Sequence, residues 1–169
     1  MLLDAILFFN ELDLLKVRLS ELYDVVDRFV VIESNRTFSG QPKPFHFLEH
    51  GWEEWLPWVK KLSHFCVTDM PDGDDPWLRE SHQRNAMSVL FGSLSAHDWV
   101  LMSDADEIPR ASALADACSH EGPAILDLRS FYYHVNRRCL QEPWWCGLKV
   151  AQVKDYLRMG GPQAVRDRV

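Results

Sequence analysis

The sequence predicts one α/β domain over residues 1–169, with a mostly parallel β-sheet flanked by helices. Three observations support this fold class. Short apolar segments alternate four times with amphipathic or polar segments between the start of the chain and residue 104, which is typical of parallel strands joined by crossover helices. The chain has 169 residues and is 47% hydrophobic, enough for one domain with its own core. It also contains no internal repeat and no low-complexity linker that would divide it.

The first two strands and the helix between them are the most regular part of the chain. Residues 5–9 are apolar and predict a buried strand. Asn10 can cap a helix that runs to about residue 24. Residues 28–33 predict a second buried strand. The predicted helix has an apolar stripe at helical spacing, formed by Leu12, Leu15, Leu19 and Leu22.

The pattern continues to a fourth strand and then loosens. A polar, proline-rich loop at 34–44 and a segment with three tryptophans precede a third predicted strand at 62–67. A helix from about 77 to 94 and a strand at 98–103 follow. After Arg110 we expect a short helix, a strand from 124 to about 133, a tryptophan-rich turn and a polar tail that contains Arg158, Arg166 and Arg168.

Charge and composition argue against several classes of partner. The formal net charge of −7 disfavours nonspecific binding to nucleic acid or to an anionic membrane. The apolar start of the chain is too short to span a membrane, is interrupted by Asp4 and lacks a basic leader, so we expect no integral membrane segment. The four cysteines show neither paired metal-ligand spacing nor a dense disulfide framework, which predicts reduced thiols and a cytoplasmic location.

An acidic stretch follows the fourth predicted strand directly. Side chains alternate along an extended chain, so Asp104 and Asp106 should point to the same side. The carboxyl edge of an open α/β sheet is where ligands bind, and paired carboxylates there suit Mg²⁺ or Mn²⁺. The alternative is a solvated acidic turn that caps the helix after Pro109.

Several spaced motifs resemble glycosyltransferase family 17 over about residues 5–150. They are FFNELDLL at 8–15, VDRFVVIESN at 26–35, TFSG at 37–40, Lys43-Pro44, the Arg84-Asn85 pair, and SDADEIP at 103–109. The resemblance implies a GT-A-like nucleotide-sugar-binding fold. It also implies a metal-dependent, inverting transfer of a sugar, expected to be N-acetylglucosamine, from a UDP-sugar to a glycan hydroxyl. A carboxylate base would deprotonate that hydroxyl, but no residue is distinguished for the role.

The resemblance assigns a role to several positions, and most have a structural alternative. Glu11 could simply favour the first turn of its helix, Glu33 could pair with a nearby arginine, and Arg84 could be a surface charge. Glu107 is either a third acid of the metal site or a partner of Arg110. The implied metal ligands are Asp104 and Asp106, for Mn²⁺ or Mg²⁺, and the implied donor-binding residues are Phe9, Asn10, Glu11, Glu33, Ser34, Arg84 and Asp104.

Two other functional classes stay open. Members of the resembled family continue well beyond the point that corresponds to residue 169, so the chain could be a truncated or non-catalytic module that binds a nucleotide sugar or a glycan. A metal-dependent phosphatase or nucleotidyltransferase is the second class. It is less favoured, because phosphatases of the haloacid-dehalogenase type place their Asp-x-Asp after the first strand, whereas here the pair follows the fourth.

Overall fold

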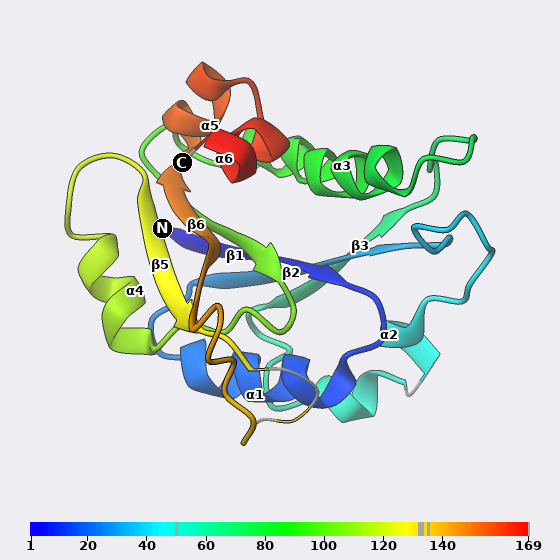
Figure 1. Ribbon diagram of the computed structural model, residues 1–169, viewed down its shortest axis with the longest axis horizontal. Coiled ribbons are helices and arrows are strands. Elements are labelled where there is room, and N and C mark those ends of the chain that lie inside the picture. The colour runs from blue at the N-terminus through cyan, green and yellow to red at the C-terminus, as the bar shows by residue number, and fades with distance from the viewer. Residues whose placement is uncertain (50, 132–133, 135, 169) are drawn as a thin grey trace.

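The computed structural model describes residues 1–49, 51–131, 134 and 136–168 (Figure 1). Its centre is a six-stranded mixed sheet in the order β3-β2-β1-β4-β6-β5. The first four strands pair in parallel, whereas β6 runs antiparallel to both β4 and β5. The strands are β1 Leu2–Phe8, β2 Arg28–Ser34, β3 Leu62–Val67, β4 Trp99–Asp104, β5 Ala124–Arg129 and β6 Trp144–Gln152.

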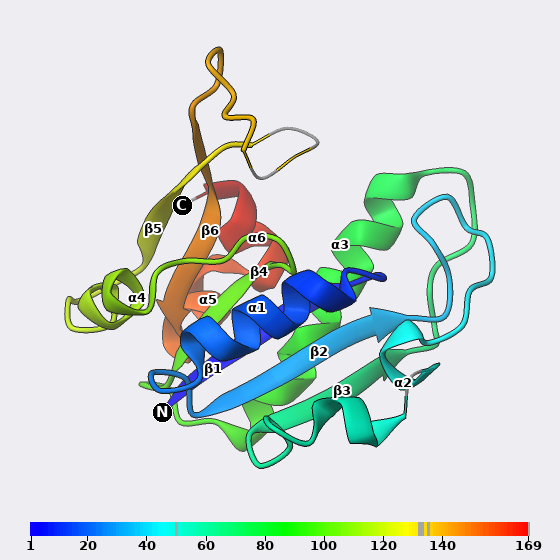
Figure 2. The ribbon, with the colours of Figure 1, turned by 90° about the horizontal axis from the view of Figure 1, so that it is seen from below.

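Helices cover both faces of the sheet, as the α/β class requires (Figures 1 and 2). One face carries α1 (Leu12–Leu22), α2 (His46–Glu49), the 3-10 helix η1 (Trp52–Trp55) and α4 (Ala111–Ala117). The opposite face carries α3 (Pro76–Ala86), the 3-10 helix η2 (Met87–Ser93), α5 (Val153–Met159) and α6 (Pro162–Arg168). Among the described residues, no helix is long and apolar enough to cross a membrane.

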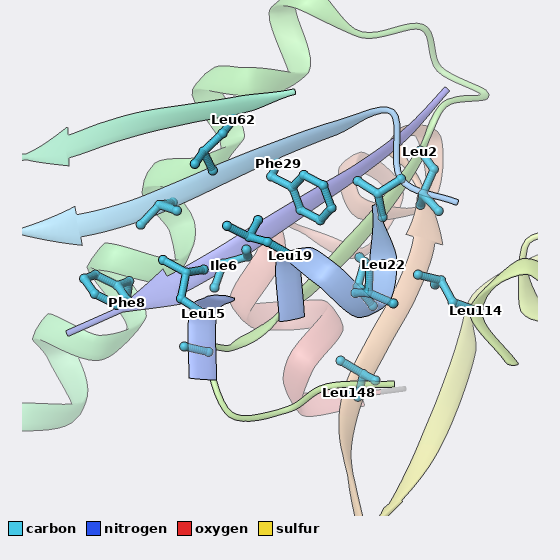
Figure 3. Packing of buried hydrophobic residues seen from close by; sticks show 14 of the residues in the cluster. Leu2, Ile6, Phe8, Leu15, Leu19, Leu22, Phe29, Leu62, Leu114 and Leu148 are labelled. Carbon is cyan, nitrogen blue, oxygen red and sulfur yellow. The ribbon is translucent and has the colours of Figure 1, made fainter. Parts of the chain in front are cut away.

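Alternate residues of the central strands fill the two cores. On β1, Ile6 and Phe8 pack against the predicted leucine stripe of α1 (Figure 3), whereas Leu3 and Leu7 face the other side. Because both faces are covered, β1 is buried along its whole length and reads as a continuous apolar run, except for Asp4.

The start of α1 differs from the prediction. The helix begins at Leu12, and Asn10 does not cap it. Instead, Glu11 occupies the capping position and turns its carboxylate back, so that Oε2 accepts from the backbone N–H groups of Phe9 and Asn10 at 3.0 Å each. The carboxylate satisfies two amides ahead of the helix, and both the cap and the first helical residue lie one position later than expected.

The predicted helix from 77 to 94 is two elements. It begins at Pro76, where Asp75 caps it by accepting from the Trp77 N–H at 3.0 Å. The α-helical part ends at Ala86, and the chain continues as the 3-10 helix η2. The predicted strand at 124–133 ends at Arg129, and its last two positions lie outside the described residues.

The largest error of the sequence prediction lies near the C-terminus. The expected tryptophan-rich turn is the start of β6, which enters the sheet between β4 and β5, and the expected polar tail forms α5 and α6. Exposed aromatic residues begin the strand, and a lysine sits in its buried stretch. The segment therefore lacks the plain apolar run by which the other central strands are recognised.

Candidate functional site

A cleft of about 480 Å³ lies at the carboxyl ends of β1 and β2, beside the end of β4. This volume is in the range of small-molecule sites, and the place is the edge at which open α/β sheets bind ligands. Its walls come from the ends of the strands, from the loop that follows β2, and from α3. The lining residues are Leu7, Phe8, Phe9, Glu11, Ser34, Arg36, Thr37, Phe38, Ser39, Lys43, Gln83, Asp104 and Ala105.

Four of the predicted donor-binding residues line this cleft, and three do not. Phe9, Glu11, Ser34 and Asp104 lie in its wall, with Phe9 41% exposed. Ser34 donates from Oγ to the carbonyl of Arg36 and so ties the loop after β2 to its strand. Asn10, Glu33 and Arg84 are absent from the lining.

Glu33 supports the cleft from behind. Its carboxylate is fully buried and accepts from Lys43 Nζ at 2.7 Å, from the backbone N–H of His46 at 2.7 Å, and lies 3.0 Å from His64 Nε2. Burial would raise the pKa of Glu33, but the bonds from His64 and Lys43 outweigh it and hold the pKa below its usual range. The partner is thus a lysine, not the arginine of the sequence alternative. Glu33 fixes Lys43, whose ammonium lies 5.3 Å from the centre of the Phe9 ring.

The acidic stretch forms a tight turn, not an extended chain. Strand β4 ends at Asp104, and the N–H groups of Glu107 and Ile108 bond back to the carbonyls of Asp104 and Asp106, both at 3.1 Å. The alternation argument for a shared side therefore fails beyond the strand. Ala105 is buried under the turn, whereas the Asp106 side chain is exposed.

Two arginines flank Asp104. Arg84 Nη2 lies 3.3 Å from Asp104 Oδ1, and Arg166 Nη2 lies 3.2 Å from Asp104 Oδ2. Arg84 also donates to Glu80 at 2.9 Å and to Gln163 at 2.7 Å. It is only 2% exposed, so the surface alternative for Arg84 is wrong. Its Nε is buried without a partner among the described residues.

Glu107 belongs to a buried pair with the C-terminal helix. Arg166 donates to both of its carboxylate oxygens at 2.9 Å, in the bidentate geometry that makes such pairs strong. The indole of Trp145 donates to the same carboxylate. Burial would raise the pKa of Glu107, but the bonds and charge of Arg166 and the Trp145 bond lower it below the usual range. Arg110, the partner considered from the sequence, has no ion pair with Glu107 in the described structure.

Asp104 and Asp106, the other two acids of the turn, are the candidates for holding a divalent cation. Partial loss of hydration, followed by the charge of Glu107, raises the pKa of both Asp104 and Asp106 above the usual range, even though the Asp106 side chain remains exposed at the surface. Asp106 has no ion pair with any described residue, so a cation would relieve repulsion that the protein does not neutralise. No group of three or more metal-binding side chains exists among the described residues. One or two carboxylates that share a hydrated ion with a substrate phosphate would suit Mg²⁺ or Mn²⁺.

The sequence prediction did not assign several residues to the site. Phe38 and Lys43 belong to the family motifs but were given no role, and the path of their loop, which also carries Arg36, is not predicted by any periodicity. Gln83 is buried in α3, where Nε2 donates to the Ile32 carbonyl at 2.8 Å. Arg166 stood out only as part of an arginine-rich tail. Its distance of 62 positions from Asp104 gave no sign of contact.

The fold and the site define a class: an α/β domain with a ligand-sized cleft and an acidic turn at the carboxyl ends of its parallel strands. Within this class, the chain belongs to glycosyltransferase family 17, whose family model matches residues 1–159. The family resemblance drawn from the sequence is thereby confirmed.

Curated relatives agree with this placement. The β-1,4-mannosyl-glycoprotein 4-β-N-acetylglucosaminyltransferases of rat and human are each 35% identical over 114 residues, and the mouse protein is 34% identical. These matches cover 63% of the chain but only 21% of each relative, so the chain spans about a fifth of their length. The crystal structure of mannose-6-phosphate isomerase from Helicobacter pylori superposes with a TM-score of 0.51 at 11% identity, covering 94% of this chain and 73% of that one. This likeness concerns the fold alone.

Proposed function

We propose that this domain has a GT-A-like fold, binds a UDP-sugar in the cleft and serves a metal-dependent, inverting glycosyltransferase. The transferred sugar would be N-acetylglucosamine and the acceptor a hydroxyl of a glycan or glycoconjugate, as the names of the relatives suggest. The single observation that carries the proposal is the cleft itself, a space of about 480 Å³ that ends on Asp104 at the acidic turn.

The lining suits a nucleoside diphosphate, and the cation would lie at Asp104, in the lining, and at Asp106, which is outside the lining but adjoins its residue Ala105. Phe9 and Phe38 are both partly exposed and offer apolar surface for a nucleoside, while Arg36 and Lys43 bring positive charge to the same cleft. Asp106, with Asp104 beside it, would hold Mn²⁺ or Mg²⁺. The bound cation would neutralise the charge that grows on the leaving diphosphate. Arg84 and Arg166 keep Asp104 in place and limit its own negative charge.

A binding module without turnover is the second candidate, and one observation favours it. The carboxylate nearest the metal-binding acids, Glu107, is bonded on both oxygens by Arg166 and has a lowered pKa. It is therefore not free to accept a proton from an acceptor hydroxyl. The described residues offer no other carboxylate whose surroundings mark it as a base.

Calorimetry with UDP, UDP-N-acetylglucosamine and GDP, in Mn²⁺ and in excess chelator, tests the proposal. UDP should bind only with the metal, and GDP should compete poorly.

Asp106→Asn should weaken metal-dependent binding more than about tenfold, because loss of a direct metal ligand costs more affinity than the usual loss of a residue that only orients a ligand. Asp116→Asn, an exposed acid on α4, is the matched control and should bind normally. Equal UDP affinity in chelator would refute the metal role, and tight GDP binding without UDP binding would refute the donor.

A further inference from the structure

Arg18 of α1 and Asp4 of β1 form a fully buried ion pair in the core. Neither side chain has any exposed surface. The guanidinium contacts both carboxylate oxygens, with Nε 2.8 Å from Oδ2 and Nη2 2.7 Å from Oδ1. Desolvation makes such a pair a weak source of stability, and apolar replacements of similar volume are often neutral or stabilising. Stability alone is therefore a poor reason for this pair.

The other donors of Arg18 all reach the acidic turn. Nη2 donates to the hydroxyl of Ser103 at 2.6 Å, and Nη1 donates to the backbone carbonyls of Asp104 and Glu107, both at 2.9 Å. Together with the two bonds to Asp4, these use the five N–H donors that a guanidinium has. One side chain thus ties both ends of the turn to the first strand and first helix of the domain.

We propose that Arg18, oriented by Asp4, is a positioning residue that presets the acidic turn for metal and diphosphate. This inference rests on the proposed function. Among the described residues, the turn has two backbone–backbone bonds of its own, from Glu107 and Ile108, and one bond from the Asp104 N–H to Glu107 Oε2 at 3.0 Å. Arg18 fixes the backbone carbonyls of Asp104 and Glu107. The side chains of Asp104 and Asp106 are therefore held in one geometry before a ligand arrives, so that binding does not have to order the turn.

Two variants separate positioning from a role in the core. Arg18→Lys keeps a positive charge for Asp4 but has three donors on one nitrogen and cannot reproduce the planar fork. The double variant Asp4→Leu with Arg18→Met removes both charges together and leaves neither buried alone. Lys61→Met is the matched control, because Lys61 Nζ likewise donates to two backbone carbonyls, those of Tyr23 and Val26 at 2.6 and 2.8 Å, but just before the amino ends of β2 and β3, whereas the acidic turn follows the carboxyl end of β4.

Two measurements on the full chain decide the question. Hydrogen exchange should speed up at least tenfold at the amides of 104–108 in both variants, and in the control only around 23–27. Mn²⁺-dependent UDP affinity should fall at least tenfold in both variants and stay unchanged in the control. Folded variants with the parent's exchange protection and affinity would overturn the proposal. If the parent itself bound no UDP, the proposed function would fail, while the exchange data would still show whether Arg18 fixes the turn.

Discussion

At the scale of single residues, charge balance separates the three acids of the turn. Asp104 lies between two guanidinium groups, and Glu107 is held by Arg166 and Trp145. Asp106 has no ion pair with the described residues and a raised pKa. Within the described residues, two of the acids are thus paired with arginines and the third is not. The sequence shows three acids in four positions but cannot show which of them is neutralised.

Arg84 illustrates how burial changes an expectation at this scale. As a solvent-facing charge it would add little to stability. Because it is buried and paired with Glu80 and Asp104, Arg84→Met should lower the free energy of unfolding by about 2 kcal/mol, less than for a fully buried pair because Asp104 is 40% exposed. Urea titration measures this, with Arg110→Met, an exposed arginine, as the control that should shift stability little. A fully stable Arg84→Met protein would show that the two ion pairs contribute nothing to the fold.

At the scale of elements, the sequence predicted what local periodicity encodes. The first four strands were found, with β3 at the same bounds, because strands buried on both faces form apolar runs. Strand β6 was missed because its first half is held by contacts with other elements, such as the bond from Trp145 to Glu107. The same limit applies to the site. The acids at the end of β4 were predictable, but the cleft wall formed by the loop after β2 was not.

Gly147 shows what β6 contributes to the turn. A Cβ built at this position would lie 2.3–2.6 Å from three atoms of the Trp145 indole, so any side chain here must displace the ring. Gly147→Ala should therefore break the indole bond to Glu107 and destabilise the fold by about 1–3 kcal/mol, with a change in tryptophan fluorescence. Gly92→Ala is the matched control, because nothing lies within 4 Å of its Cβ, and it should be near neutral. If the two variants had equal free energies of unfolding, the position of the Trp145 indole against Gly147 would not contribute to stability.

At the scale of the whole molecule, the acidic turn is contacted by side chains from the first and the last helix of the chain. Arg18 reaches it from α1, and Arg166 reaches it from α6 after 59 further positions beyond Glu107. Gln163 of the same C-terminal helix contacts Arg84 of α3. The site is thus built by tertiary contacts among helices on both faces of the sheet. No pattern of local spacing could have predicted these contacts, although the residue types were visible in the sequence.

The acids of the turn and Glu33 make the free energy of unfolding depend on pH in two opposite ways. The raised pKa values of Asp104 and Asp106 mean that the folded state takes up protons at a higher pH than the unfolded state, whose aspartates titrate near about 3.9, so mild acidification should stabilise the fold slightly. The lowered pKa values of Glu33 and Glu107 act in the other direction. Their stabilisation is complete above the unfolded value of about 4.3 and is lost as the pH falls from there through the folded values.

Urea midpoints measured from pH 7 to pH 3 should therefore rise a little and then fall steeply. Asp106→Asn should remove part of the early rise, since it deletes one acid that the fold holds at a raised pKa. Glu33→Gln should lower stability at neutral pH but flatten the later fall, because the amide has no proton to gain in either state. If the Glu33→Gln protein lost stability below pH 4.3 as steeply as the parent, the buried contacts of Glu33 with Lys43 and His64 would not be what acid breaks, and the fall would have to come from Glu107 and its pair with Arg166.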